Sequence, residues 1–349
     1  MHIQSLNGSL THIFEDEENQ ILAKSILGST DVDKIAEDIN QLCACELGSP
    51  IAHCLNVEFS VGASFGLALQ DGRKIFLKIH KTNEDDRPAA ITLASLTIIS
   101  KIQRDLAASG FPCPSVIHEP IQTRYGVATV DAFENIGEQK DAHNSIIRGE
   151  IARTLADLIQ RTQAYRSMPG LPCGRLFSSS TLYPVPHNVL FDFDGTAKGA
   201  AWIDEIARKA KMSIQDTKGE MVLGHTDWSL KHFRFKDSKI VMIYDWDSLK
   251  LEDELNLLGI AAATFTTTWD IKTKITPSVE ECYAFVKDYE FYRGRPFTKQ
   301  AFEKISAAIT YCMAYISRCE FALDADGEKF EGSFRQALQE MNRRNVSIF

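Results

Sequence analysis

The sequence of 349 residues lacks a long hydrophobic run. Its longest uncharged apolar stretch, LNLLGIAAATFTTTW at residues 255–269, is short and rich in threonine, which favours a buried helix over a membrane span. The first 20 residues also lack a basic segment followed by an apolar one. We therefore expect no signal peptide, no membrane partner and a cytoplasmic location.

Basic residues are scarce relative to acidic ones. The chain has 38 Lys and Arg against 47 Asp and Glu, which gives a net charge of −9. Nucleic acids and anionic membranes require basic surface, so we expect no nucleic-acid partner. The acidic balance is compatible with a small cationic substrate.

Cysteine pairs with the usual zinc-binding spacing are missing. The eight cysteines are scattered through the chain. Cys43, Cys45 and Cys54, with His53 beside them, could be imagined as a zinc site, but they lack Cys-x-x-Cys spacing. We expect buried, reduced thiols without disulfides.

The length predicts two domains, or one domain with two lobes. Residues 1–50 are interpreted as an N-terminal extension of one or two helices, the clearest at 31–47. Residues 51–135 are predicted to form a small nucleotide-binding lobe, in which Asp71-Gly72 indicates a hairpin. Its five predicted strands are at residues 57–61, 64–70, 74–80, 115–122 and 125–133, with a helix at 88–110 that begins near Pro88 and ends before Gly110.

Residues 136–349 are predicted to form a larger, mainly helical lobe that holds the catalytic loop and the acceptor site. Helical periodicity is clear at 145–165, 278–294 and 298–323. An irregular zone, residues 167–245, lies between these helices. The predicted fold class is thus α+β, with an antiparallel sheet in the small lobe.

The stretch NVLFDFDGTAKG, at residues 188–199, resembles the Asp-x-Asp-Gly-Thr signature of haloacid dehalogenase-type phosphatases. That reading would make Asp192 the nucleophile and Asp194 the acid. It would leave about half the chain unexplained, and the region lacks the alternation of strands and helices that a parallel sheet needs. We therefore expect Asp192 and Asp194 to lie in a turn, and we keep the phosphatase as a minor alternative.

Four other features occur in the order that phosphoryl transfer from a nucleotide requires. A loop of small residues, SVGASFG at 60–66, precedes a strand that carries Lys78. A His-x-Asp loop, His225 to Asp227, follows, and an apolar strand then ends in Asp245-Trp246-Asp247. Each feature alone is common, so the order and the spacing carry the hypothesis.

The chemistry explains these residue types. Gly62, Ala63 and Ser64 let backbone N–H groups approach phosphates closely. A strand lysine neutralises phosphates, one aspartate receives the proton of the acceptor hydroxyl, and a second aspartate holds Mg²⁺. We expect only one of the two aspartates at the strand end, Asp245, to face the cleft, and we expect Asp247 to serve as a cap or to support its neighbours.

The motifs GHTDWSLKHFRF and VMIYDWDSL resemble the catalytic loop and the metal-binding segment of the aminoglycoside phosphotransferase superfamily. These are protein-kinase-like enzymes that phosphorylate hydroxyls of small molecules. The resemblance spans residues 57–255, with similar helices to about 323. It implies a two-lobed kinase-like fold, ATP or GTP as donor, catalytic base Asp227, metal ligand Asp245, nucleotide lysine Lys78, and a hinge at Asp131–Phe133 whose backbone meets adenine.

Two positions depart from the family pattern. The family has asparagine five residues after the base, where this chain has His232. His232 either ligates the metal, which would favour Mn²⁺ over Mg²⁺, or satisfies a hydrogen bond in the core. The helix after Lys78 should supply a glutamate, yet residues 87–104 contain no acid; Glu84, Asp85 and Asp86 come before it and Asp105 late in it. A nucleotide-binding pseudoenzyme of the same fold is therefore the main alternative.

Overall fold

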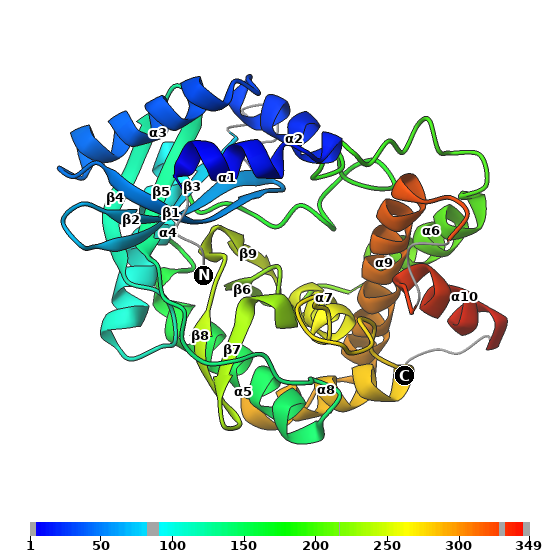
Figure 1. Ribbon diagram of the computed structural model, residues 1–349. Helices are drawn as coiled ribbons and strands as arrows, with labels where there is room; N and C mark the ends of the chain where they lie inside the picture. The colour runs from blue at the N-terminus through cyan, green and yellow to red at the C-terminus, as the bar shows by residue number, and fades with distance from the viewer. Residues whose placement is uncertain (1–4, 82–90, 216, 328–331, 345–349) are drawn as a thin grey trace. The chain divides into compact units, whose positions relative to one another are not determined.

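The computed structural model describes residues 5–81, 91–215, 217–327 and 332–344 (Figure 1). The chain divides into two units. Unit 1 contains Met1–Ser109, Pro114–Asn135 and His187–Leu190, and unit 2 contains Gly110–Cys113, Ile136–Pro186 and Phe191–Phe349.

Unit 1 is built on one five-stranded antiparallel sheet with the strand order β1-β2-β3-β5-β4. The five predicted strands are all present, and four of them lie within two residues of their predicted bounds. The first begins at Ile51, six residues before its predicted start at residue 57. The five strands are β1 (Ile51–Phe59), β2 (Gly62–Leu69), β3 (Lys74–His80), β4 (Val116–Thr123) and β5 (Gly126–Ala132).

The predicted hairpin joins β2 and β3. Leu69 accepts a turn hydrogen bond from the Gly72 N–H at 3.1 Å and donates its own N–H to the Arg73 carbonyl at 2.8 Å. Gly72 has a φ of 90°, a left-handed conformation that glycine adopts without steric cost. This turn sets the register that pairs Ser64 with Lys78.

Three helices, and not one or two, precede the sheet: α1 (Leu6–Ile13), α2 (Glu17–Leu27) and α3 (Val32–Glu46). Asp16 separates the first two, because its carboxylate accepts the Glu18 N–H at 2.9 Å as an N-cap. Gly28 ends α2 with a φ of 67°. Such caps interrupt a periodic pattern locally, which makes two short helices hard to separate by periodicity.

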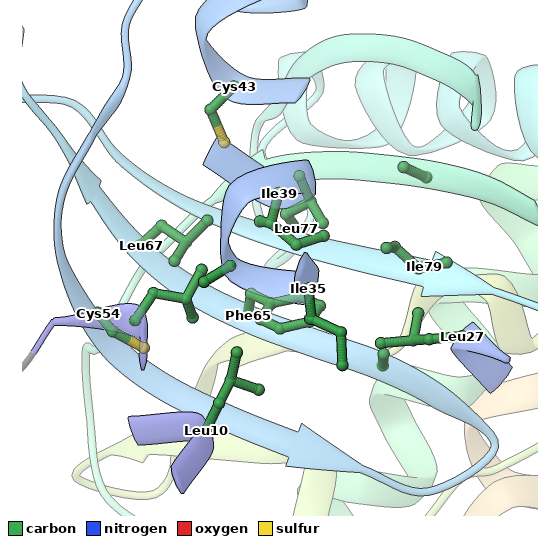
Figure 2. Close-up of a cluster of buried hydrophobic side chains, with 14 of the residues drawn as sticks. Leu10, Leu27, Ile35, Ile39, Cys43, Cys54, Phe65, Leu67, Leu77 and Ile79 are labelled. Carbon is green, nitrogen blue, oxygen red and sulfur yellow. The ribbon is translucent and has the colours of Figure 1, made fainter. Parts of the chain in front are cut away.

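The three helices share a hydrophobic core with the sheet. Leu10 of α1 and Ile35 of α3 are fully buried together with Phe65 and Leu77 of the strands (Figure 2). The apolar faces of the helices are therefore covered by the sheet, and the sheet face by the helices.

Helix α4 (Leu93–Ala108) connects β3 to β4 along the chain. It begins after Thr92, because Thr92 and Ser95 form a reciprocal capping box, with the Ser95 N–H 3.1 Å from Thr92 Oγ1. The predicted start near Pro88 lies outside the described residues. Gly110, just past the helix, has a φ of 80°, as expected for a C-terminal glycine.

Unit 2 is mainly helical, and the three predicted helices are confirmed. The helix predicted at 278–294 has a cap at each end. Ser278 is its N-cap, and Gly294 ends it in a left-handed conformation. The helices of unit 2 are α5 (Ser145–Thr162), α6 (Ala201–Gln215), α7 (Glu254–Thr264), α8 (Val279–Arg293), α9 (Lys299–Leu323) and α10 (Phe334–Arg344). Helix α10 was not predicted.

The apolar stretch at 255–269 forms helix α7 only as far as Thr264, and all the residues of α7 are buried. Within the described residues, no helix is both long and apolar enough to cross a membrane.

Two short hairpin-like pairs interrupt the helices of unit 2. Strand β6 (Met221–His225) pairs with β9 (Leu249–Asp253), and β7 (Phe233–Lys236) pairs with β8 (Lys239–Ile243), both antiparallel. Strands β6 and β8 match apolar runs in the sequence, whereas β7 and β9 were not predicted. These pairs position the loop that carries Asp227.

The cysteines are free thiols, as predicted. Cys43 and Cys54 are buried as predicted, but the prediction of burial is wrong for Cys45, which is exposed near the end of α3. Burial raises the pKa of the Cys43 thiol to about 12, so the thiol stays protonated and unreactive at neutral pH.

Candidate active site

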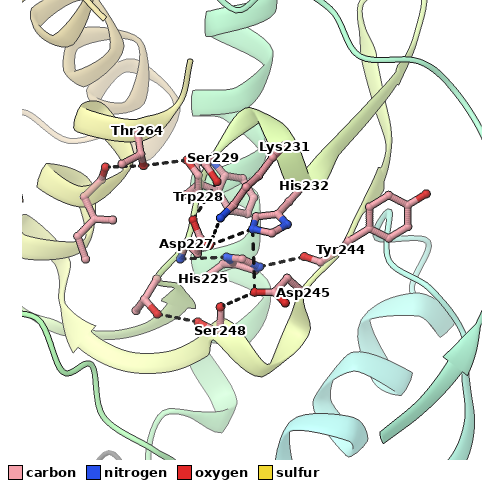
Figure 3. A network of polar contacts seen from close by, with 12 residues as sticks. His225, Asp227, Trp228, Ser229, Lys231, His232, Tyr244, Asp245, Ser248 and Thr264 are labelled. Atoms are coloured by element: carbon pink, nitrogen blue, oxygen red, sulfur yellow. Dashed lines mark hydrogen bonds and ion pairs between the residues drawn. The ribbon is translucent and has the colours of Figure 1, made fainter. Parts of the chain in front are cut away.

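The candidate active site of unit 2 is a loop between β6 and β7 together with the segment after β8 (Figure 3). Trp228 anchors this loop. Its side chain is fully buried, its indole N–H donates to the Ile151 carbonyl at 3.3 Å, and its ring lies 4.8 Å from that of Phe233. The loop therefore has a fixed base from which polar side chains project.

His225 links the loop to the segment after β8. Its Nδ1 accepts the Asp227 N–H at 3.3 Å, and its Nε2 lies 3.1 Å from the Tyr244 carbonyl. This pairing requires a neutral ring protonated at Nε2. Burial and the neighbouring His232 lower the pKa of His225, which maintains that neutral state.

The Asp227 carboxylate collects three donors. Its Oδ1 accepts the Ser229 hydroxyl at 2.8 Å. Its Oδ2 lies 2.9 Å from Lys231 Nζ and 3.0 Å from His232 Nε2. Burial would raise the pKa of this carboxyl, but the charges of Lys231 and His232 hold the pKa well below its usual range. Asp227 is thus an oriented, ionised carboxylate.

Asp245 lies two residues after the end of β8 in a left-handed conformation, with a φ of 68°. Such a conformation is uncommon for a residue other than glycine and is concentrated at functional sites. The Ser248 hydroxyl donates to Asp245 Oδ2 at 2.9 Å, and the Ser248 carbonyl accepts the Thr226 N–H at 2.8 Å. Ser248 therefore connects Asp245 with the loop between β6 and β7.

Asp227, His232 and Asp245 together present a possible metal site. One ligand atom from each of the three side chains lies within 4.8 Å of the others. Two carboxylates and an imidazole suit a divalent cation, and the carboxylates supply the oxygen ligands that Mg²⁺ prefers. Asp247 lies in the short helix Trp246–Ser248 and is not one of this group.

His232 contacts both aspartates through the same nitrogen. Its Nε2 lies 3.0 Å from Asp227 Oδ2 and 4.0 Å from Asp245 Oδ2, and its side chain is 14% exposed. The sequence suggested two roles for His232, and one contact of the side chain fits each role. The hydrogen bond to Asp227 fits a positioning role, and the proximity to Asp245 fits metal ligation.

Unit 1 brings together the residues expected to bind phosphates. Ser64 and Lys78 are cross-strand partners on β2 and β3. A Cβ on Gly62 would lie 2.6 Å from the Ile79 carbonyl oxygen and 3.5 Å from Lys78 Cε. Only glycine therefore fits at residue 62, which lies directly beside the lysine.

The residues of the expected hinge lie at the end of β5 and just beyond it. Asp131 Oδ1 accepts the Gln103 side-chain amide of α4 at 3.1 Å. The Phe133 N–H donates to the Lys74 carbonyl at 3.0 Å, and the Phe133 ring packs on Gly66. Since the Phe133 N–H is already bonded within the sheet, a backbone donor for adenine would have to come from a later residue.

Helix α4 has one acidic residue, Asp105, whose carboxylate pairs with Lys101 at 2.7 Å. Glu84, Asp85 and Asp86 lie outside the described residues. The expectation that an acid pairs with Lys78 therefore stays a prediction.

The Asp-x-Asp stretch forms a turn, as expected, and among the described residues no strand ends directly before it. Asp192 Oδ1 accepts the Gly195 N–H at 2.8 Å, and Asp192 also accepts the Thr196 hydroxyl through its carbonyl. The buried Arg318 of α9 donates to Thr196 Oγ1 at 2.9 Å and stacks over Phe193. Asp192 thus shapes a turn that α9 holds, and it does not end a strand as a phosphatase nucleophile would.

Sequence reasoning missed Ser229, Lys231 and Ser248, which contact the two aspartates directly. They are ordinary residue types, and their roles depend on how the chain turns back on itself. The one signal was their position within five residues of Asp227 or Asp245.

No protein-family model and no curated protein sequence matches this chain. Many solved structures do resemble it. A complex of amicoumacin kinase with AMP-PNP and Ca²⁺ superimposes with a TM-score of 0.57 at 12% identity, over 84% of this chain and 89% of the other.

Two further solved structures have similar statistics. The GDP complex of aminoglycoside 2'-phosphotransferase-IIIa has a TM-score of 0.53 at 12% identity, over 90% of this chain and 100% of that one. An ethanolamine kinase from Plasmodium vivax has a TM-score of 0.51 at 12% identity, over 95% of each chain.

At these identities the likeness establishes the fold, a five-stranded antiparallel sheet followed by a mainly helical unit. This protein therefore has the two-part, kinase-like fold of these small-molecule kinases and phosphotransferases.

Proposed function

We propose that this protein is a phosphotransferase that transfers the γ-phosphoryl group of ATP or GTP to a hydroxyl group of a small molecule. The observation that carries the proposal is the cluster of Asp227, His232 and Asp245, whose ligand atoms lie within 4.8 Å of one another. The cluster occurs in a fold whose solved examples include small-molecule kinases.

Asp227 is the proposed catalytic base. A carboxylate has about four acceptor positions, and Ser229, Lys231 and His232 occupy three of those on Asp227. The remaining position is suited to the acceptor hydroxyl. Because its pKa is held low, Asp227 orients the hydroxyl in the ground state and receives the proton only as the new bond to phosphorus forms.

Asp245 and His232 are the proposed ligands of a divalent cation, Mg²⁺ or Mn²⁺. When bound, such a cation neutralises charge on the phosphates of the nucleotide. The left-handed backbone at Asp245 and the Ser248 hydroxyl fix the direction of that carboxylate before any cation binds.

Gly62, Ser64 and Lys78 are the proposed phosphate-binding residues of unit 1. The proposal is supported by position, because Gly62 lies beside Lys78 and Ser64 is the cross-strand partner of that lysine. Asp131 and Phe133 are proposed to mark the adenine-binding segment.

The proposed acceptor is a hydroxylated and cationic small molecule. The net charge of −9 favours cationic ligands over anionic ones. Among the solved structures of this fold are an ethanolamine kinase and a phosphotransferase complexed with kanamycin. We do not propose nucleic acids or membranes as partners. We propose a cytoplasmic location.

A coupled assay of nucleotide consumption tests the proposal. ATP and GTP are offered with Mg²⁺ to a panel of hydroxylated molecules that begins with ethanolamine and kanamycin. Asp227→Asn should abolish transfer and leave nucleotide binding nearly intact, since the base acts on the acceptor. The matched control Asp192→Asn should change turnover by less than about tenfold, or ~1.4 kcal/mol of barrier.

The opposite pattern would exclude the kinase. If Asp192→Asn abolished hydrolysis of a phosphate ester such as p-nitrophenyl phosphate and Asp227→Asn did not, the protein would be a phosphatase.

A nucleotide-binding pseudoenzyme is the second candidate. It is favoured by the hydrogen bond from His232 to Asp227 and by the pairing of Asp105, the one acid of α4, with Lys101. A pseudoenzyme would bind nucleotide without consuming it in the presence of any acceptor.

A further inference from the structure

Lys231 is the cation nearest to the proposed base among the contacts of Asp227. Its Nζ lies 2.9 Å from Asp227 Oδ2, and the two side chains are 35% and 36% exposed. Both side chains are therefore partly exposed to solvent.

The backbone of Lys231 is held from both sides. Its N–H donates to the Thr267 carbonyl at 3.0 Å. Its carbonyl accepts the Gln139 side-chain amide at 3.3 Å and the Arg234 guanidinium at 3.0 Å. This bracing fixes the point on the loop from which the lysine side chain extends towards Asp227.

The contacts of Asp227 limit the distance between the Lys231 ammonium and the acceptor oxygen that reacts. An acceptor hydroxyl that gives its proton to Asp227 lies about 3 Å from the carboxylate. Lys231 Nζ already lies 2.9 Å from that carboxylate. The ammonium is then within about 6 Å of the oxygen that bonds to phosphorus, a distance that a lysine can shorten by rotating its side chain.

We propose that Lys231 is a catalytic residue whose ammonium contacts the oxygens of the phosphoryl group during transfer. This inference rests on the proposed function. In the transfer step the acceptor oxygen forms a bond to the γ-phosphorus while the bond to the bridging oxygen breaks, and the electron pair of that bond leaves with the nucleoside diphosphate. The hydroxyl proton passes to Asp227, and Lys231 keeps its own protons.

Proton transfer to Asp227 weakens the ion pair of Lys231 and favours a new contact of its ammonium. When Asp227 takes up the proton, its negative charge disappears and the ion pair with Lys231 weakens. The phosphoryl oxygens then offer the ammonium a negative charge that Asp227 has lost. The ammonium thus stabilises charge that is present in the transition state more than in the resting site.

The alternative is that Lys231 only compensates the charge of Asp227 in the folded protein. Removal of the lysine would then lower stability, because a partly buried carboxylate would lose its partner. Turnover for each folded molecule would change little.

The experiment compares Lys231→Met and Lys231→Arg with Lys209→Met, whose lysine is 76% exposed on α6. The acceptor is the one that turns over fastest in the panel above, and water serves as acceptor in slow hydrolysis of ATP. Lys231→Met should lower kcat about 100-fold or more. The KM for ATP and the rise in Tm with Mg²⁺ and ATP should stay nearly unchanged, because binding of the nucleotide does not need this charge.

Lys231→Arg keeps the charge and should restore kcat to within about tenfold of the wild type. Lys209→Met should have no effect. If Lys231→Met does not fold, Lys231→Gln replaces it. A kcat for the uncharged variant within about threefold of the wild type would overturn the inference, as would a loss explained entirely by a weaker KM for ATP. Absence of any nucleotide consumption by the wild type would instead refute the proposed function, and this inference with it.

Discussion

A single nitrogen of His232 serves two contacts that exclude each other once a metal binds. Nε2 lies 3.0 Å from Asp227 and 4.0 Å from Asp245. A nitrogen that coordinates a cation has no proton to donate, so ligation would end the hydrogen bond to Asp227. The choice between the two roles can therefore be measured through the preference for metals.

We expect His232→Asn to shift the metal optimum from Mn²⁺ towards Mg²⁺ and to keep or raise turnover, since an amide oxygen suits the harder cation. Turnover of both proteins is measured across a range of Mg²⁺ and Mn²⁺ concentrations. An unchanged metal preference together with a lowered Tm would mean that His232 is only a hydrogen-bond partner of Asp227.

At the scale of elements, the N-terminal helices are part of the core of unit 1. Ile35 of α3 is fully buried among strand residues, whereas Ile21 of α2 is 50% exposed. The stability of the sheet therefore depends on α3.

Truncation of the buried isoleucine should show this dependence. We expect Ile35→Ala to lower the free energy of unfolding by about 2–5 kcal/mol, through lost apolar burial and a cavity. The control Ile21→Ala, on a neighbouring helix, should cost less than about 1 kcal/mol. Both are measured by urea denaturation. Equal effects of the two changes would show that α3 contributes no more to this core than the surface of α2.

The loop between α7 and α8 is linked to the start of α5 through His143. Nδ1 of this ring lies 2.7 Å from Glu281 Oε1, and Nε2 lies 2.8 Å from the Lys274 carbonyl. Both partners are acceptors, so the ring is doubly protonated. Burial opposes the charge of His143, but the Lys274 carbonyl and the Glu281 carboxylate outweigh it and raise its pKa.

Because the pKa of His143 is higher in the folded state, its contribution to stability is fully present below the usual histidine pKa of about 6.5. The contribution is lost as the pH rises through the folded pKa. We expect His143→Gln to lower Tm more at pH 6 than at pH 9. The control His12→Gln removes a pair with Glu15 that is 76% and 73% exposed, and it should change Tm little at either pH. A Tm difference for His143→Gln that is constant with pH would contradict the assignment.

For the whole molecule, ligand binding reports on the proposed nucleotide site independently of catalysis. ATP or GTP with Mg²⁺ should raise Tm, because a ligand that binds the folded state stabilises it by mass action. Lys78→Ala should weaken that rise, whereas Lys101→Ala, on the exposed side of α4, should preserve it. The measurement is a thermal melt at millimolar nucleotide. If neither nucleotide shifts Tm, the chain has the fold of a kinase without its ligand.

Much of the secondary structure could be predicted from the sequence, because it depends on interactions between residues close along the chain. Helix α8 lies between Ser278 and Gly294, whose capping chemistry is local. The five strands of unit 1 follow from alternating apolar residues and turn residues. The order of Lys78, Asp227 and Asp245 was likewise visible, since these roles need specific residue types at spaced positions.

Tertiary structure decided what depends on contacts distant in sequence. Strand β9, LKLED, lacks the apolar run that makes β6 and β8 recognisable, and it exists because β6 pairs with it. The ionisation of Asp227 follows from Lys231 and His232, which a tight turn brings back to its carboxylate. The sequence around Asp192 matches a phosphatase signature. In the structure it forms a turn, and Arg318 of a helix distant in sequence holds this turn. The sequence determined which groups are available for chemistry, and packing determined which of them meet, because the energy of a buried charge or a strand pair depends on its partner.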